Sequence, residues 1–141
     1  MSSQVAQKSQ KRRPAPEQDR IIAEALRRAG RPVSAYEIID RVRDTVVLAP
    51  QTVYRALDRL IAGGKAHRLE SLNAFVACHQ HDHHGAAVFA ICEDCGKVRE
   101  FDEQAAILPL EAWARREGFE VRQMTLELRG RCASCRPRPA G

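Results

Sequence analysis

Cysteine and histidine, two side chains that commonly bind zinc, are concentrated from residue 67 onward, where all five cysteines and all five histidines of this chain lie. Four of the cysteines form two CxxC pairs, Cys92 with Cys95 and Cys132 with Cys135. Four thiolates around one point suit the tetrahedral coordination of Zn²⁺, and a site closed by four protein ligands has no open position for a reactive water. The two pairs therefore predict one structural zinc site formed by Cys92, Cys95, Cys132 and Cys135.

The fifth cysteine, Cys78, lies among the histidines, which are His67, His79, His81, His83 and His84. A His-rich tract alone is typical of a solvated loop that binds metal weakly. His67, however, starts one short strand-like run, Cys78 ends the next, and Glu100 lies at the end of a later one. One thiolate, two imidazoles and one carboxylate fit Zn²⁺, whereas Fe²⁺ prefers nitrogen and oxygen donors. We therefore predict a second zinc site from His67, Cys78, Glu100 and one histidine of the tract.

The part of the chain before these ligands has helical hydrophobic periodicity. The first of three expected helices begins near Glu17. The second begins after a capping box at Ser34. The third begins near Pro50, because proline is tolerated in a first helical turn. Two strand-like runs joined by turn-forming residues follow. Three helices and a hairpin are typical of a winged helix-turn-helix, which we expect over residues 17–78.

The rest of the chain predicts a smaller α/β domain over residues 79–136, so the fold class is α+β. The expected elements are strands at Val88–Cys92, Lys97–Phe101 and Val121–Arg129, and a helix at Pro109–Glu117 that buries Leu110, Trp113 and Ala114. Both CxxC pairs then lie in turns at strand ends. Residues 137–141 are expected to be a flexible tail.

Composition limits the functions that need to be considered. The 141 residues allow one ordinary domain or two small ones, and the net charge is +5. No apolar run approaches the roughly 20 residues of a membrane span, so we expect a cytoplasmic protein whose thiols bind metal rather than form disulfides. Residues 1–16 form a basic tail that suggests nucleic acid as a partner, although such a tail is also typical of a disordered, solubilising segment.

The second site would draw ligands from both domains, since His67 belongs to the winged helix and Glu100 to the α/β domain. A metal held by both would favour one relative orientation over the others. That is the property required of a sensor. A zinc hydrolase or deaminase is the enzyme class to exclude: the HxE and PCxxC motifs of deaminases are both missing from the sequence, and no enzymatic activity is expected.

Three segments resemble motifs of the ferric uptake regulator family, and most closely its zinc uptake branch: Thr52-Val-Tyr-Arg-Ala-Leu57, His67-Arg-Leu-Glu-Ser71 and Ile91-Cys-Glu-Asp-Cys-Gly-Lys-Val98. The resemblance extends from about Glu17 to Cys135. It implies an N-terminal DNA-reading domain, a C-terminal α/β dimerisation domain with a four-cysteine zinc, and therefore a homodimer.

The resemblance also implies roles for particular residues. Tyr54 and Arg55, together with Gln51 and Thr52, would contact operator DNA, although packing of Tyr54 under the wing is an alternative. Arg is the commonest reader of guanine. In the regulatory site the fourth ligand would be His84, with His83 as its substitute.

This chain also departs from the family pattern. It has Ala87 and Phe89 where many members have a His-x-His pair, and Met124 where members with a third metal site have a histidine. A third site is therefore not expected, and His79 and His81 are left without an assigned role.

The function implied is a zinc-sensing repressor that binds operator DNA as a dimer and controls zinc uptake genes. It would hold about two Zn per chain and have no membrane or small-molecule partner. An iron, manganese or peroxide sensor of the same fold is an alternative. A zinc-stabilised interaction module without DNA binding is another, which would leave the segment from Thr52 to Leu57 unexplained.

Overall fold

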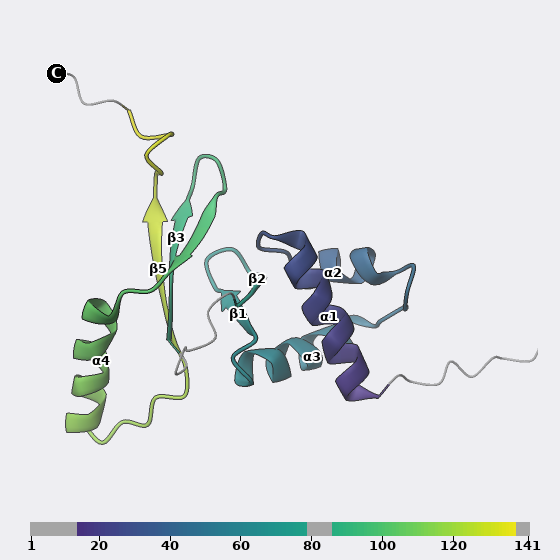
Figure 1. Cartoon of the computed structure of the whole chain (residues 1–141), viewed down its shortest axis with the longest axis horizontal. Helices are drawn as coiled ribbons and strands as arrows, with labels where there is room; N and C mark the ends of the chain where they lie inside the picture. The colour runs from purple at the N-terminus through teal and green to yellow at the C-terminus, as the bar shows by residue number, and fades with distance from the viewer. Residues whose placement is uncertain (1–13, 79–85, 138–141) are drawn as a thin grey trace, which may run out of the picture.

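A computed structural model of the chain describes residues 14–78 and 86–137, and these form two parts with different secondary structure (Figure 1). The first part contains α1 (Ala15–Ala29), α2 (Ala35–Val42), α3 (Pro50–Ala62), β1 (Ala66–Leu69) and β2 (Ala74–Ala77). The second contains β3 (Ala86–Cys92), β4 (Val98–Phe101), α4 (Gln104–Arg116) and β5 (Met124–Gly130). The α+β class predicted from the sequence is confirmed.

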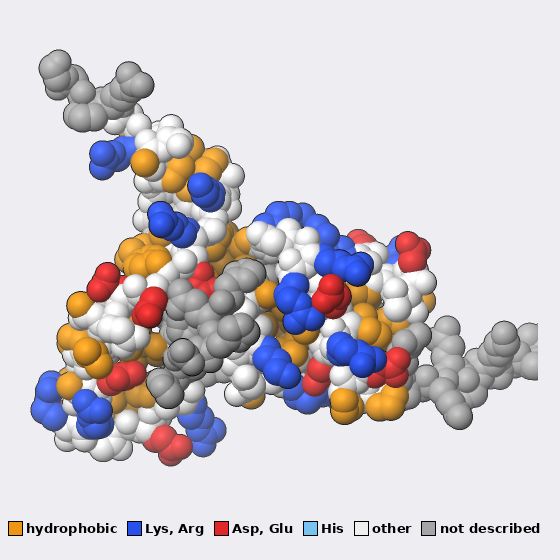
Figure 2. All heavy atoms as spheres, in the orientation of Figure 1, with side chains coloured by type: hydrophobic (Ala, Val, Ile, Leu, Met, Phe, Trp, Pro, Cys, Tyr) orange, Lys and Arg blue, Asp and Glu red, His pale blue; other side chains and the backbone are white. Residues whose placement is uncertain are grey.

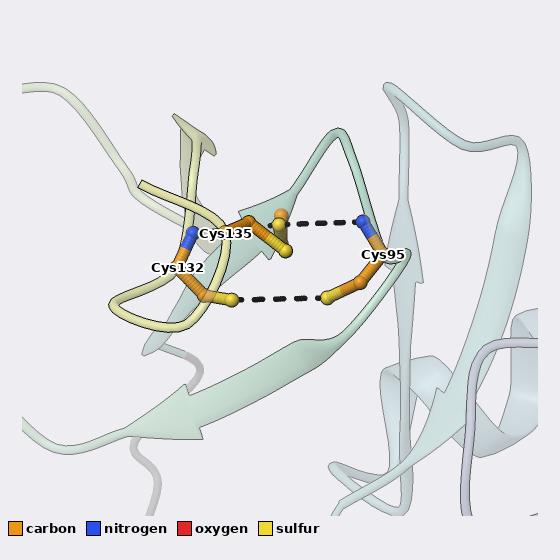
Figure 3. Close-up of side chains that lie close together, drawn as sticks. Cys95, Cys132 and Cys135 are labelled. Carbon is orange, nitrogen blue, oxygen red and sulfur yellow. Dashed lines mark hydrogen bonds between the residues drawn. The ribbon is translucent and has the colours of Figure 1, made fainter. Parts of the chain in front are cut away.

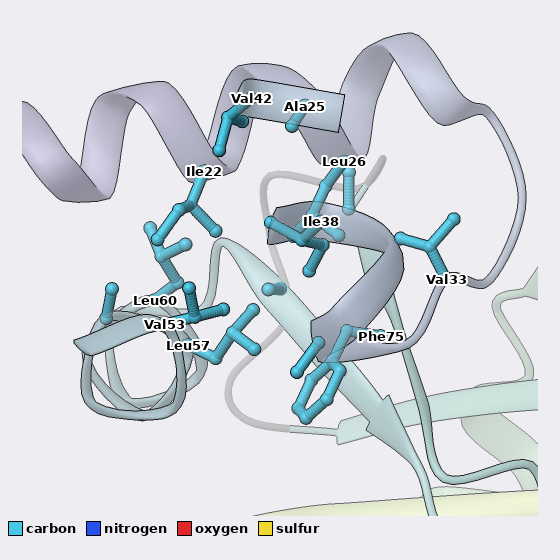
Figure 4. Packing of buried hydrophobic residues seen from close by; sticks show 14 of the residues in the cluster. Ile22, Ala25, Leu26, Val33, Ile38, Val42, Val53, Leu57, Leu60 and Phe75 are labelled. Carbon is cyan, nitrogen blue, oxygen red and sulfur yellow. The ribbon is translucent and has the colours of Figure 1, made fainter. Parts of the chain in front are cut away.

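The three N-terminal helices pack around one apolar core (Figure 4). Ile22 of α1, Ile38 of α2 and Val53 of α3 are fully buried there. Ser34 caps α2, because its hydroxyl accepts the Glu37 N–H at 3.1 Å, while the Glu37 carboxylate pairs with Arg31 at 3.0 Å. Gly30 ends α1 with a φ of 62°, a left-handed conformation that favours glycine. The sequence therefore specifies both the ends and the buried faces of these helices.

The hairpin of β1 and β2 is the wing, and it lies between the helices and the sheet (Figure 1). Its antiparallel register pairs His67 with Val76. Two backbone hydrogen bonds of 2.8 and 3.0 Å join Phe75 to Val33, just before α2, and so tie the wing to the helices. On its other side the wing packs on the sheet through Leu69, which is fully buried.

The sheet of the second part has the strand order β4-β3-β5, with β3 antiparallel to β4 and parallel to β5. Ala87, Phe89 and Ile91 of β3 pack against Leu69 of the wing. Alternate residues Ala86 and Val88 pack instead with Ile107 of α4. Because successive side chains of a strand point to opposite faces, the wing and α4 cover opposite faces of the sheet.

Helix α4 differs from the helix predicted at Pro109–Glu117. It begins at Gln104, so Pro109 lies inside it. Ile107 and Ala114 form its buried face, whereas Leu110 is 42% exposed and Trp113 is 51% exposed. Their predicted burial is therefore wrong for the single chain, and only that of Ala114 is correct. Pro109 cannot donate a backbone hydrogen bond within the helix, and Ile107, two residues before it, is buried against the sheet.

Strand β5 begins at Met124, where its ladder with Ala86 of β3 starts, and not at Val121. Hydrophobic side chains remain visible over α4 and the neighbouring strands (Figure 2). Among the described residues, no helix has the length and apolar character needed to cross a membrane.

Candidate metal centres and nucleic-acid interface

The two CxxC pairs come together because β3 and β5 are parallel neighbours that end at the same edge of the sheet. Their register pairs Cys92 with Gly130, so Cys95 and Cys132 both lie in turns just beyond that edge. One sulfur atom from each of Cys92, Cys95, Cys132 and Cys135 lies within 4.8 Å of the other three. The sulfurs of Cys95 and Cys132 are 3.8 Å apart (Figure 3).

These distances fit a zinc ion better than disulfides. A disulfide needs sulfurs about 2.05 Å apart. Zn–S bonds of about 2.3 Å in a tetrahedron place neighbouring sulfurs about 3.8 Å apart, which equals the separation of Cys95 and Cys132. The five cysteines, all of which lie among the described residues, form no disulfide. The donor set therefore suits a tetrahedral, thiolate-bound metal.

The electrostatics of this cluster also favour a bound cation. Backbone N–H groups of Cys132 and Cys95 donate to the Cys92 sulfur, at 3.4 and 3.5 Å. They lower the pKa of Cys92 to about 6. The neighbouring thiols, first Cys132 and then Cys92 and Cys95, raise the pKa of Cys135 to about 12. Four thiolates therefore oppose one another's charge, and a divalent cation would relieve that repulsion.

A second cluster joins the wing to the sheet. One donor atom from each of His67, Cys78 and Glu100 lies within 4.8 Å of the other two. The His67 Nε2 is 3.7 Å from a Glu100 carboxylate oxygen, and both side chains are about nine-tenths buried. The Cys78 N–H donates to the Lys65 carbonyl at 2.9 Å, which extends the β1–β2 ladder and aligns Cys78 beside His67.

The rest of the predicted second site cannot be located in the same way. The preferred ligand His84, its substitute His83, and the unassigned His79 and His81 all lie outside the described residues. The three donors that are described, an imidazole, a thiol and a carboxylate, are the set that the sequence analysis associated with zinc. They would hold a metal at the boundary between the wing and the sheet.

Helix α3 presents the residues expected to contact DNA. Val53 and Leu57 are fully buried, and the opposite face exposes Gln51, Tyr54 and Arg55, with Thr52 half-buried. Tyr54 packs against the wing, since its ring meets Phe75 edge-on at 6.4 Å, and it remains 38% exposed. Arg55 makes no salt bridge with the described residues, so its guanidinium is available to a ligand.

Comparison with known proteins identifies the family. Residues 13–129 match the ferric uptake regulator family. The chain belongs to this family. It is 40% identical over 106 residues to a zinc uptake regulation protein of Escherichia coli K12, a match that covers 73% of this chain and 61% of that protein. The match thus spans less than two thirds of the relative's length.

Solved structures of ferric uptake regulator relatives agree with this fold. A crystal structure described as holo XcZur has a TM-score of 0.71 and 42% identity, covering 83% of this chain and 82% of that one. A zinc uptake regulator complexed with zinc and DNA has a TM-score of 0.72 and 31% identity, covering 83% and 79%. Because each match covers 83% of this chain, the structural similarity includes the second part of the fold as well as the winged helix.

One contact at the four-cysteine cluster is not predicted by the sequence of this ferric uptake regulator relative. Arg131 donates to Asp94 at 3.0 Å, and these two residues belong to the two different cysteine turns. In the sequence, the only sign of this ion pair is that oppositely charged residues lie in or beside the two CxxC pairs. Both side chains are substantially exposed, so the ion pair contributes little, about 0–1 kcal/mol.

Proposed function

We propose that this chain is a zinc-sensing transcriptional repressor that binds operator DNA as a homodimer and controls zinc uptake genes. The observation that carries the proposal is the His67, Cys78 and Glu100 cluster, which joins the wing of a DNA-reading fold to the sheet of the second domain. Residues 17–78 would be the DNA-binding domain and residues 79–136 the dimerisation domain.

Zinc would have two separate roles. The four cysteines would hold a structural ion, whose binding free energy stabilises the second domain. His67, Cys78 and Glu100, with His84 or His83, would hold the regulatory ion, for a total of about two Zn per chain. The chain carries the regulatory donors on both sides of the boundary, so metal binding favours the orientation that brings them together.

DNA recognition would fall to α3. Its exposed face includes Gln51, Tyr54 and Arg55, and its buried face anchors it in the helical core. The Arg59 guanidinium also forms three hydrogen bonds of 2.8 to 3.1 Å with Asp19 of α1, which fixes α3 against that helix. A rigidly mounted helix with an available Arg is suited to reading guanine in the major groove. The related zinc uptake regulator complexed with zinc and DNA supports this role.

The second domain has a surface suited to dimerisation. Leu108 and Trp113 of α4 are more than half exposed, as are Phe119 and Leu128. The rings of Trp113 and Phe119 are 6.1 Å apart. Aromatic residues in such patches commonly dominate interface energetics. Trp113→Glu should therefore produce monomers that sedimentation velocity can detect, whereas a variant that remains dimeric at low micromolar concentration would exclude this face.

An iron, manganese or peroxide sensor is the less favoured alternative. The thiol of Cys78 suits zinc better than iron, and Met124 packs in the apolar cluster under α4 rather than offering a nitrogen ligand. An interaction module without DNA binding is disfavoured by the exposed polar face of α3. The protein is proposed to be a regulator and not an enzyme.

One titration tests the function. A DNA duplex would first be selected by this protein from a random pool at saturating zinc, and then labelled. Fluorescence anisotropy at buffered free Zn²⁺, Fe²⁺ and Mn²⁺ should show DNA binding at the lowest free concentration for zinc. Failure to enrich any duplex, or equal binding with and without metal, would contradict the proposal.

A further inference from the structure

Three residues form a row across the sheet beneath the wing. Phe89 of β3 is paired directly with Glu100 of β4 on one side and with Glu127 of β5 on the other. Directly opposed residues on neighbouring strands point to the same face of a sheet. Glu100, Phe89 and Glu127 therefore present two carboxylates and one aromatic ring toward the wing, which covers this face.

The wing meets each member of this row in turn. His67 lies 3.7 Å from Glu100 and stacks edge-on against Phe89 at a ring separation of 5.4 Å. Leu69, two residues later, is fully buried against the cluster that contains Phe89. Ser71, two residues later again, reaches Glu127. Its backbone N–H lies 3.4 Å from both Glu127 carboxylate oxygens, and its hydroxyl lies 3.3 Å from one of them.

The wing is thus attached to the sheet at two separate points. His67 lies in β1, whereas Ser71 lies four residues later in the turn that follows this strand. A metal at His67 restrains one end of the wing but leaves rotation about that point. The contact at Ser71 removes this rotation, because it holds the other end on a different strand. Leu69 packs between the two points, but apolar contact is not directional.

We propose that Glu127 is a positioning residue for zinc response: it holds the wing in the orientation in which the regulatory ligands converge and the recognition helix is presented to DNA. This inference rests on the proposed zinc-dependent DNA binding. Glu127 does not bind the metal or DNA. It stabilises the metal-competent orientation before zinc arrives, so less zinc is needed to populate that orientation.

The proposal predicts a specific change in the zinc titration. Glu127→Ala should raise the free zinc concentration for half-maximal DNA binding about three- to tenfold, the range expected for a charge-assisted contact at a partly exposed site. At saturating zinc, DNA affinity should return to within about twofold of the unaltered protein, because bound metal can then drive the orientation alone. A residue that touched DNA would instead weaken binding at every zinc concentration.

The matched controls separate position from charge. Glu120→Ala removes a carboxylate from an exposed residue outside the wing contact and should leave the titration unchanged. Glu127→Gln keeps an accepting oxygen and should restore part of the lost response. Ser71→Ala removes only the hydroxyl donor and should give a smaller shift than Glu127→Ala. If Glu127→Ala fails to fold, Glu127→Gln and Ser71→Ala should still both require more zinc than Glu120→Ala.

A second readout distinguishes this proposal from the proposed function. Zinc affinity of the regulatory site, measured without DNA by competition with a chelating dye, should fall in Glu127→Ala while the four-cysteine zinc is retained. If the unaltered protein binds zinc but shows no zinc-dependent DNA binding, the proposed function fails, and this dye measurement still decides whether Glu127 positions the wing. If DNA binding is zinc-dependent but the Glu127 and Glu120 variants give the same curves, the positioning role is wrong.

Discussion

The four-cysteine cluster lies within one sheet, whereas the cluster of His67, Cys78 and Glu100 lies between that sheet and the wing. In the first, two adjacent parallel strands place both CxxC turns at the same edge. In the second, each half supplies part of the donor set, and the donors meet only when the halves are packed together. The first arrangement suits a metal that stabilises a domain, and the second suits a metal that reports how two domains are arranged.

The two clusters also differ in how deeply their side chains are buried. Cys92 is buried, but Cys95 is exposed and Cys132 and Cys135 are half-buried, so the four-cysteine cluster is partly open to solvent. His67 and Glu100 are almost fully enclosed by the packing of Leu69 and Phe89. Any movement of the wing would therefore change the second cluster and leave the first intact. Four variants can test this contrast.

The largest effect is expected from Cys135→Ser. Structural zinc sites contribute on the order of 10 kcal/mol of folding free energy, so the second domain should lose its zinc and its cooperative unfolding transition. Calorimetry and metal analysis would measure both. Ser134→Ala, in the same turn, is the control and should change neither. Retention of the zinc and of the full unfolding transition by Cys135→Ser would show that this cluster is not structural.

Cys78→Ser should act on function and leave the fold intact. It removes one ligand of the second cluster, so about one zinc per chain should be lost while the dimer and the four-cysteine zinc remain. Zinc-dependent DNA affinity should fall by more than about tenfold, since the orientation is no longer held by metal. Anisotropy with the selected duplex would measure this. A variant that still binds DNA in a zinc-dependent manner would contradict the interdomain role.

Arg55→Ala tests whether the N-terminal part of the chain, which carries the wing, reads DNA through α3. The free energy of specific binding should weaken by about 1–3 kcal/mol, the discrimination expected from one Arg–guanine pair. Non-specific binding should stay nearly constant. Replacing Lys11, Arg12 and Arg13 with Gln is the contrasting variant. It should weaken binding to all sequences equally and flatten the salt dependence. Equal losses of specific and non-specific affinity in Arg55→Ala would argue against base reading.

Arg131→Ala should have the smallest effect. It removes an exposed ion pair that links the two cysteine turns, worth about 0–1 kcal/mol. Thermal unfolding should shift by no more than a few degrees, and the bound zinc should be unchanged. Loss of zinc would show that the turns depend on this ion pair and not only on the metal and the backbone hydrogen bonds around Cys92.

Local sequence patterns predicted much of the fold. The N-cap at Ser34 and the apolar spacing in α3 correspond to structural features that depend on neighbours within a few residues. Helix α4 was predicted less well, because Pro109 suggested a helix start and Trp113 a core residue. The local sequence pattern does not show that Ile107 is buried against the sheet. Nor does it show that Trp113 lies on a surface suited to contact with a second chain.

Residue types and spacing were sufficient to group the two CxxC pairs, since such turns at the ends of strands have few other uses. They were also sufficient to propose His67, Cys78 and Glu100 as ligands. The contact of Ser71 with Glu127 could not be found in this way. It depends on Glu100, Phe89 and Glu127 falling into one row across three strands, and the register that aligns them arises from packing between segments far apart in the chain.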